Sequence, residues 1–136
     1  MKVILDTNVF VSAIFWKGHS RNILQAWKEK ELKLVLSAEI IDEYKRVSMV
    51  LSSRYKGLEI LPIIELLAFN SEIYENNILK EKVCSDPDDD KFISCALYSK
   101  TKYIVSGYKH LLDQNGYREL QILKPKDFVI KILQNK

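Results

Sequence analysis

The stretch VILDTNV, from Val3 to Val9, joins a short apolar run to three polar residues. Its first part is typical of a strand that is buried on both faces of a sheet. Asp6 ends that strand, and residues 9–15 are predicted to form a helix. An aspartate in this place either caps the helix or presents its carboxylate at the carboxyl edge of the sheet. Position alone slightly favours the cap, although Asn8 could cap the helix equally well.

The same alternation of strand and helix continues along the chain. Short strands are predicted at residues 34–36, 72–74, 103–105 and 120–123. Helices are predicted at about residues 20–31, 38–52 with Ser37 as N-cap, 58–69 and 91–100, and from Pro125 onward. Such an alternation indicates a central, mainly parallel sheet that is covered on both sides. We therefore expect the α/β class, a three-layer α/β/α sandwich, with residues 1–136 as a single domain.

The composition excludes several function classes. With 136 residues, 47% of them hydrophobic, and a net charge of +3, the chain suits one compact core. The four glycines are isolated, which excludes a glycine-rich nucleotide loop, and Cys84 and Cys95 form neither a disulfide framework nor a zinc pattern. No apolar run could span a bilayer and no secretory signal is visible, so we expect a cytoplasmic protein.

Charge is distributed unevenly along the chain. Residues 1–56 carry a net charge of +4, residues 57–90 carry −7, and residues 91–136 carry +6. Basic flanks around an acidic segment fit a protein that binds a polyanion and holds cations in a local pocket. A mixed, solvated surface explains the same charges more simply, and charge alone favours that interpretation.

The most unusual segment is DPDDD, from Asp86 to Asp90. Its four carboxylates within five residues repel one another unless the segment is solvated or holds cations. Asp89 lies four residues before Ile93 and continues the core-facing stripe of the following helix, whereas Asp88 is placed to cap it. A solvated helix start would explain one or two of these acids better than four.

A third acidic position is Glu43, on the border of the apolar stripe of the predicted helix 38–52. Such a carboxylate is usually solvated or paired with a basic side chain, and that is the simpler interpretation of Glu43 alone. The strand ends can, however, bring Asp6, Glu43 and Asp89 to one edge of the sheet. Clustered oxygen ligands without paired cysteines or histidines suit Mg²⁺ or Mn²⁺, which activate water and neutralise a phosphodiester.

Four ordered pieces of the sequence resemble the PIN-domain family of ribonucleases, which includes the VapC-like toxins of toxin–antitoxin pairs. The pieces cover nearly the whole chain and are LDTNV from Leu5, Ser37 through Tyr44, DPDDDKF from Asp86, and Ser106-Gly107 followed by Leu111-Leu112. The resemblance implies a Mg²⁺- or Mn²⁺-dependent endoribonuclease in which Asp6, Glu43 and Asp89 are the catalytic and metal-binding residues. It also implies an RNA substrate, an antitoxin partner and a homodimer.

The resemblance also assigns supporting residues. Hydrogen bonds from Thr7, Asn8 and Ser106 are expected to support Asp6. Asp86 is expected in the outer part of the site, and Asp90 is an alternative to Asp89 as a ligand.

The sequence departs from the family pattern at Tyr108 and His110, where the family commonly carries acids. A neutral phenol is a poor Mg²⁺ ligand, and a histidine suits Mn²⁺ better than Mg²⁺. The resemblance therefore leaves two alternatives open. Either the site works with fewer acidic ligands, or the chain is a catalytically degenerate PIN fold that binds RNA or protein.

Two further interpretations concern phosphate chemistry. The basic residues that are candidates for contacting an RNA backbone are Lys17, Arg21, Arg46, Lys91 and Lys109. A phosphotransfer or phosphatase domain with Asp6 as nucleophile also fits an aspartate after the first strand. That alternative is weaker, because the acid, Thr or Lys positions expected of such folds are not convincingly arranged.

Overall fold

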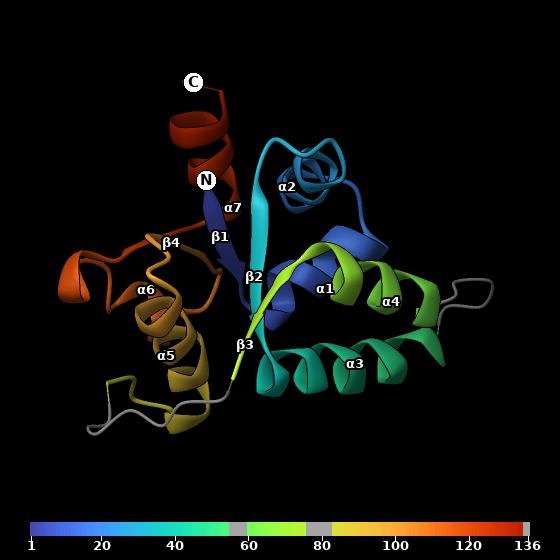
Figure 1. Ribbon diagram of the computed structural model, residues 1–136, viewed down its shortest axis with the longest axis horizontal. Coiled ribbons are helices and arrows are strands. Elements are labelled where there is room, and N and C mark those ends of the chain that lie inside the picture. The colour runs from blue at the N-terminus through green and yellow to red at the C-terminus, as the bar shows by residue number, and fades with distance from the viewer. Residues whose placement is uncertain (55–59, 76–82, 135–136) are drawn as a thin grey trace.

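The computed structural model describes residues 1–54, 60–75 and 83–134, which contain a five-stranded, all-parallel sheet (Figure 1). The strand order is β3-β2-β1-β4-β5. The strands are β1 (Lys2–Leu5), β2 (Lys33–Ser37), β3 (Glu72–Tyr74), β4 (Tyr103–Val105) and β5 (Gln121–Leu123). The predicted parallel sheet is confirmed, and each of the five predicted strands lies at or within one residue of its expected bounds.

The α-helices lie on both faces of this sheet. They are α1 (Thr7–Phe15), α2 (His19–Lys28), α3 (Ala38–Ser52), α4 (Leu61–Asn70), α5 (Asp90–Ser99), α6 (Lys109–Leu112) and α7 (Pro125–Phe128). Helices α1 to α4 cover one face, and α5 and α6 cover the other (Figure 1). This is the arrangement that right-handed crossovers between parallel strands require. The predicted three-layer α/β/α sandwich is confirmed.

Local hydrogen bonds explain where the helices begin. Helix α1 begins two residues earlier than predicted because the Asp6 carboxylate accepts the N–H of Val9 and caps it. Ser37 caps α3 as predicted, with its hydroxyl accepting the N–H of Ile40 at 3.2 Å. The last helix begins at Pro125 and continues as a π-helix over Val129–Leu133. Of the predicted helix 58–69, the first two positions lie outside the described residues.

The core fills the space between the sheet and its helices. The three middle strands contribute fully buried residues such as Ile4, Leu36 and Ile104. On the α1 side, the rings of Phe10 and Tyr44 stack with their centroids 4.2 Å apart, and the Tyr44 hydroxyl donates to the carbonyl of Leu5. This contact ties α1 and α3 to the carboxyl end of β1 and so holds the backbone next to Asp6.

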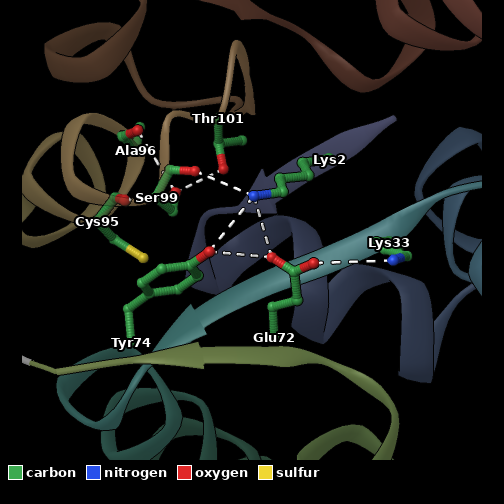
Figure 2. Close-up of polar contacts among 8 residues, drawn as sticks. All are labelled: Lys2, Lys33, Glu72, Tyr74, Cys95, Ala96, Ser99 and Thr101. Atoms are coloured by element: carbon green, nitrogen blue, oxygen red, sulfur yellow. Dashed lines mark hydrogen bonds and ion pairs between the residues drawn. The ribbon is translucent and has the colours of Figure 1, made fainter.

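A polar cluster holds the short edge strand β3 to the rest of the sheet (Figure 2). The Lys2 ammonium lies 3.1 Å from the Glu72 carboxylate, 3.3 Å from the Tyr74 hydroxyl and 3.1 Å from the Ser99 carbonyl oxygen. The hydrogen bond from Lys2 lowers the pKa of Glu72. Because these residues come from β1, β3 and the end of α5, the cluster links three elements that are distant in sequence.

No helix in the described ranges is long and apolar enough to cross a membrane.

Candidate active site

Asp6 lies at the point of the sheet where the strand order reverses. Its strand, β1, is paired with β2 on one side and with β4 on the other. After β1 the chain enters α1 on one face of the sheet, and after β4 it enters α6 on the opposite face (Figure 1). Open parallel α/β sheets bind their ligands at such a switch point. Asp6 and Ser106, the residues that follow β1 and β4, are both fully buried.

Both oxygens of the Asp6 carboxylate accept hydrogen bonds. Oδ1 accepts the N–H of Val9 at 2.8 Å, and Oδ2 accepts the hydroxyl of Ser106. Asp6 is therefore a helix cap and a carboxylate at the switch point at the same time. The two interpretations of this residue are not exclusive.

Burial raises the pKa of Asp6 from its ordinary value of 3.8 to about 6. Hydrogen bonds from Ser106 and from the N–H groups of Val9 and Gly107 lower this pKa, whereas the negative charge of Asp89 raises it. The largest influence is the loss of water around the ionised carboxylate. A bound cation would offset that loss directly.

Glu43 points from α3 toward the start of α1 instead of into solvent. Its side chain is 14% exposed, and its Oε2 accepts the hydroxyl of Thr7. Its Oε1 lies 2.5 Å from the Lys91 ammonium and 3.8 Å from the Arg46 guanidinium. Because the single hydroxyl proton of Thr7 goes to Glu43, the expected support of Asp6 by Thr7 is corrected. Thr7 instead links α1 to the Glu43 carboxylate.

The acids of the DPDDD segment have separate roles. Asp86 accepts the N–H of Asp88 at 3.0 Å and caps the 3₁₀-helix Pro87–Asp89. The cap of α5 predicted at Asp88 is wrong, because α5 follows this 3₁₀-helix and its N-cap position is Asp89, without a side-chain hydrogen bond. Asp90 uses both oxygens to accept the N–H groups of Val83 and Cys84, at 3.1 and 2.7 Å. Asp90 therefore ties the start of α5 to the segment before it. This geometry favours Asp89 over Asp90 as a candidate ligand.

Asp89 is half-buried at the start of α5. Burial raises its pKa, and the charges of Asp86, Glu43 and Asp88 raise it further, while His110 lowers it. The charge of Glu43 therefore acts on Asp89, and the charge of Asp89 also raises the pKa of Asp6. The three acids that the sequence singled out lie around one edge of the sheet.

Tyr108 lies among the same three acids. Burial raises the pKa of its phenol, and the charges of Asp6, Asp89 and Glu43 raise it further, so the group is neutral at pH 7. The side chain of Asn8 forms a hydrogen bond with this phenol. Tyr108 also donates its backbone N–H to the Ser106 hydroxyl oxygen at 2.9 Å. A neutral side chain therefore stands beside the acids where the family resemblance expects a fourth carboxylate.

The donor chemistry of the site fits a hard divalent cation. Asp6, Glu43 and Asp89 supply carboxylate oxygens, which Mg²⁺ and Mn²⁺ prefer. Within residues 1–54, 60–75 and 83–134, no group of three or more His, Cys, Asp or Glu side chains is already arranged to hold an ion. Glu43 is turned toward Lys91 instead. The acidic side chains would have to move for all three to reach one ion.

Two of the basic residues expected to contact RNA are engaged within the protein. The Arg21 guanidinium donates to the carbonyl oxygens of Ala13 and Ile14, at 3.2 and 2.9 Å, and closes the end of α1. Lys91 has a side chain that is only 5% exposed. The expected role of Lys91 in RNA contact is therefore corrected, whereas the half-buried Arg21 stays a candidate. The remaining candidates, all exposed, are Lys17, Arg46 and Lys109.

Comparison with known families covers the region that carries these residues. A family model described as PIN domain matches residues 2–110, and this range includes every acid described above. The chain belongs to the PIN-domain family. PIN domains are generally nucleases, so this chain belongs to a family of nucleases.

This PIN domain is also similar to individual proteins. It is 35% identical to an uncharacterised protein of Methanocaldococcus jannaschii, MJ1680, over 95% of this chain and 90% of that protein. It shares its fold with a chain in the crystal structure of VapBC2 from Rickettsia felis bound to a DNA fragment from their promoter. That likeness has a TM-score of 0.55 at 16% identity and covers 91% of this chain and 98% of the other.

Proposed function

We propose that this PIN domain is a divalent-metal-dependent endoribonuclease and the toxin component of a toxin–antitoxin pair. Asp6, Glu43 and Asp89 are its proposed catalytic and metal-binding residues. The observation that carries the proposal is Asp6, a fully buried carboxylate at the switch point whose pKa is raised to about 6 by loss of water. Carboxylates that are desolvated in this way and crowded by other acids concentrate at functional sites.

The residues around the acids keep them in place. Ser106 and the Val9 N–H fix the rotamer of Asp6, and Thr7 fixes one oxygen of Glu43. The fixed Asp6 carboxylate loses little conformational entropy on binding, whereas Glu43 is turned toward Lys91. Mg²⁺ or Mn²⁺, when bound, would activate water and neutralise charge on the phosphodiester.

Exposed basic residues beside the acids provide contacts for the RNA backbone. Arg46 lies one turn after Glu43 on α3, with its guanidinium 3.8 Å from the Glu43 carboxylate. Lys109 follows Tyr108 directly and begins α6. Both side chains are exposed and positively charged, so they can approach phosphates next to the acidic site.

The likeness in fold to a chain of VapBC2, which is described as bound to promoter DNA, supports the proposal of an antitoxin partner. Exposed apolar side chains on α3 and α4 offer surface for protein contacts and include Val50, Leu66 and Phe69, of which Phe69 is 89% exposed. We extend the proposal to a homodimer that acts in the cytoplasm.

Cleavage of a labelled single-stranded RNA by the purified chain tests the proposal. We expect cleavage in Mn²⁺ or Mg²⁺ and a loss of at least about 100-fold when a chelator is added, because the ion carries the phosphate chemistry. Cleavage that continues undiminished in chelator would overturn the metal-dependent mechanism.

A second candidate function is a degenerate PIN fold that binds RNA without cutting it, and Tyr108 favours this alternative. The substitution Tyr108→Asp separates the two functions, with Tyr98→Asp, on an exposed side chain of α5, as the matched control. For an active enzyme we expect Tyr108→Asp to raise Mn²⁺ affinity by about tenfold, through one added charge beside the ion. If the wild type does not cleave RNA but the Tyr108→Asp variant does, the natural protein is a binding module.

A further inference from the structure

Lys91 is a buried cation in an unfavourable place. It is the second residue of α5, and its side chain is 5% exposed. The amino end of a helix carries a partial positive charge, which disfavours a lysine there. Burial of an ammonium group also costs free energy unless a negative partner is close. A lysine at this position therefore depends on its partner.

That partner is Glu43, one of the three proposed ligands. The Lys91 ammonium lies 2.5 Å from Glu43 Oε1 and 3.6 Å from the carboxylate of Asp88, whose side chain is 71% exposed. Arg46 approaches the same Oε1 at 3.8 Å, but its side chain is 68% exposed. Solvent screens the pairs with Asp88 and Arg46 much more than the buried pair. Lys91 is accordingly the cation that dominates at Glu43.

This pairing changes the charge of the proposed site. Three negative charges come from the ionised acids Asp6, Glu43 and Asp89. Lys91 contributes one positive charge, and the neutral Tyr108 contributes none. A divalent ion is therefore attracted by a net charge of −2 instead of −3 and has to share Glu43 with an ammonium group. The second oxygen of Glu43 is already held by the Thr7 hydroxyl.

We propose that Lys91 is a positioning residue that acts as a built-in cation of the acidic site, holding Glu43 and weakening the attraction of the site for divalent ions. The inference rests on the proposed function and adds a control of metal affinity to it. A purely structural ion pair between α3 and α5 would leave that affinity unchanged. The affinity for an ion therefore distinguishes the two roles.

Calorimetric titration of the full chain with Mn²⁺ tests the inference. Lys91→Met removes the charge and keeps most of the side-chain volume, and we expect it to raise Mn²⁺ affinity by at least about tenfold. Lys91→Arg keeps the charge and should stay near the wild-type affinity. Arg46→Met is the matched control, because it removes an exposed cation from the same oxygen, and its effect should stay below about threefold.

A double variant shows whether the gain passes through Glu43. In Lys91→Met combined with Glu43→Gln, the increase in affinity should disappear, because no carboxylate is released. Thermal melting checks that each variant is folded. If Lys91→Met does not fold, Lys91→Gln replaces it, and we expect the same increase in Mn²⁺ affinity.

The outcomes separate this inference from the proposed function. If Asp6→Asn abolishes Mn²⁺ binding while folded Lys91→Met binds as the wild type does, the role of Lys91 is wrong and the metal site stands. If neither the wild type nor any variant binds Mn²⁺, the metal-dependent function is wrong, and the inference falls with it.

Discussion

The substitution Asp6→Asn is expected to reduce RNA cleavage by about a thousandfold, which is about 4 kcal/mol of transition-state stabilisation. The amide oxygen can still accept the Val9 N–H that the carboxylate accepts at 2.8 Å, so the cap of α1 is retained. The negative charge at the switch point is lost. The change therefore removes a metal ligand and leaves the fold in place.

The matched control for this prediction is Asp42→Asn. Asp42 is the exposed neighbour of Glu43 on α3, and its substitution removes one carboxylate without touching the site. We expect cleavage rates within about threefold of the wild type for Asp42→Asn. Equal loss in the two variants, or none in either, would show that the reaction does not depend on the buried carboxylate.

The second large effect is a dependence of stability on pH that arises from Asp6. Its pKa is about 6 in the folded chain and near its ordinary value of 3.8 in the unfolded chain. Between these two values the folded chain keeps a proton that the unfolded chain has released. In the absence of metal, the contribution of Asp6 is therefore fully present below about pH 4 and is lost as the pH rises through about 6. The size of this loss is about 3 kcal/mol.

Denaturant unfolding between pH 4 and pH 8, in chelator, measures this dependence. The difference in the free energy of unfolding between Asp6→Asn and the wild type isolates the residue from other titrating groups. We expect Asp6→Asn to gain stability relative to the wild type as the pH rises from 4 to 7. A difference that stays constant with pH would mean that the carboxylate is not desolvated as described.

Much of the fold was predictable because its signals are local. Short apolar runs such as Val3–Leu5 predict buried strands, and Ser37 predicts the start of α3 from its capping hydroxyl. The two core cysteines were also foreseen as free thiols, and burial raises the pKa of each to about 12. Helix ends were less certain, because the early start of α1 depends on which of two residues caps it.

The candidate site was only partly predictable, because it depends on contacts between distant segments. The positions of Asp6 and Asp89 follow from strand ends and helical spacing. The burial of Lys91 does not, since it requires α3 to bring Glu43 within 2.5 Å of a residue 48 positions later. The sequence feature that indicates this burial is the position of Lys91 directly before Phe92 and Ile93 in an apolar helix. Likewise, nothing local shows that Thr7 donates to Glu43 and not to Asp6.

The central claim is that the buried carboxylate at the switch point holds a divalent ion. The number of Mn²⁺ ions bound per chain, measured for the wild type and for Asp6→Asn at pH 7, tests it most directly. At this pH Asp6 is mostly ionised, since its pKa is about 6. We predict saturable Mn²⁺ binding to the wild type and none to Asp6→Asn. Equal binding by the two chains, or none by the wild type, would contradict the claim.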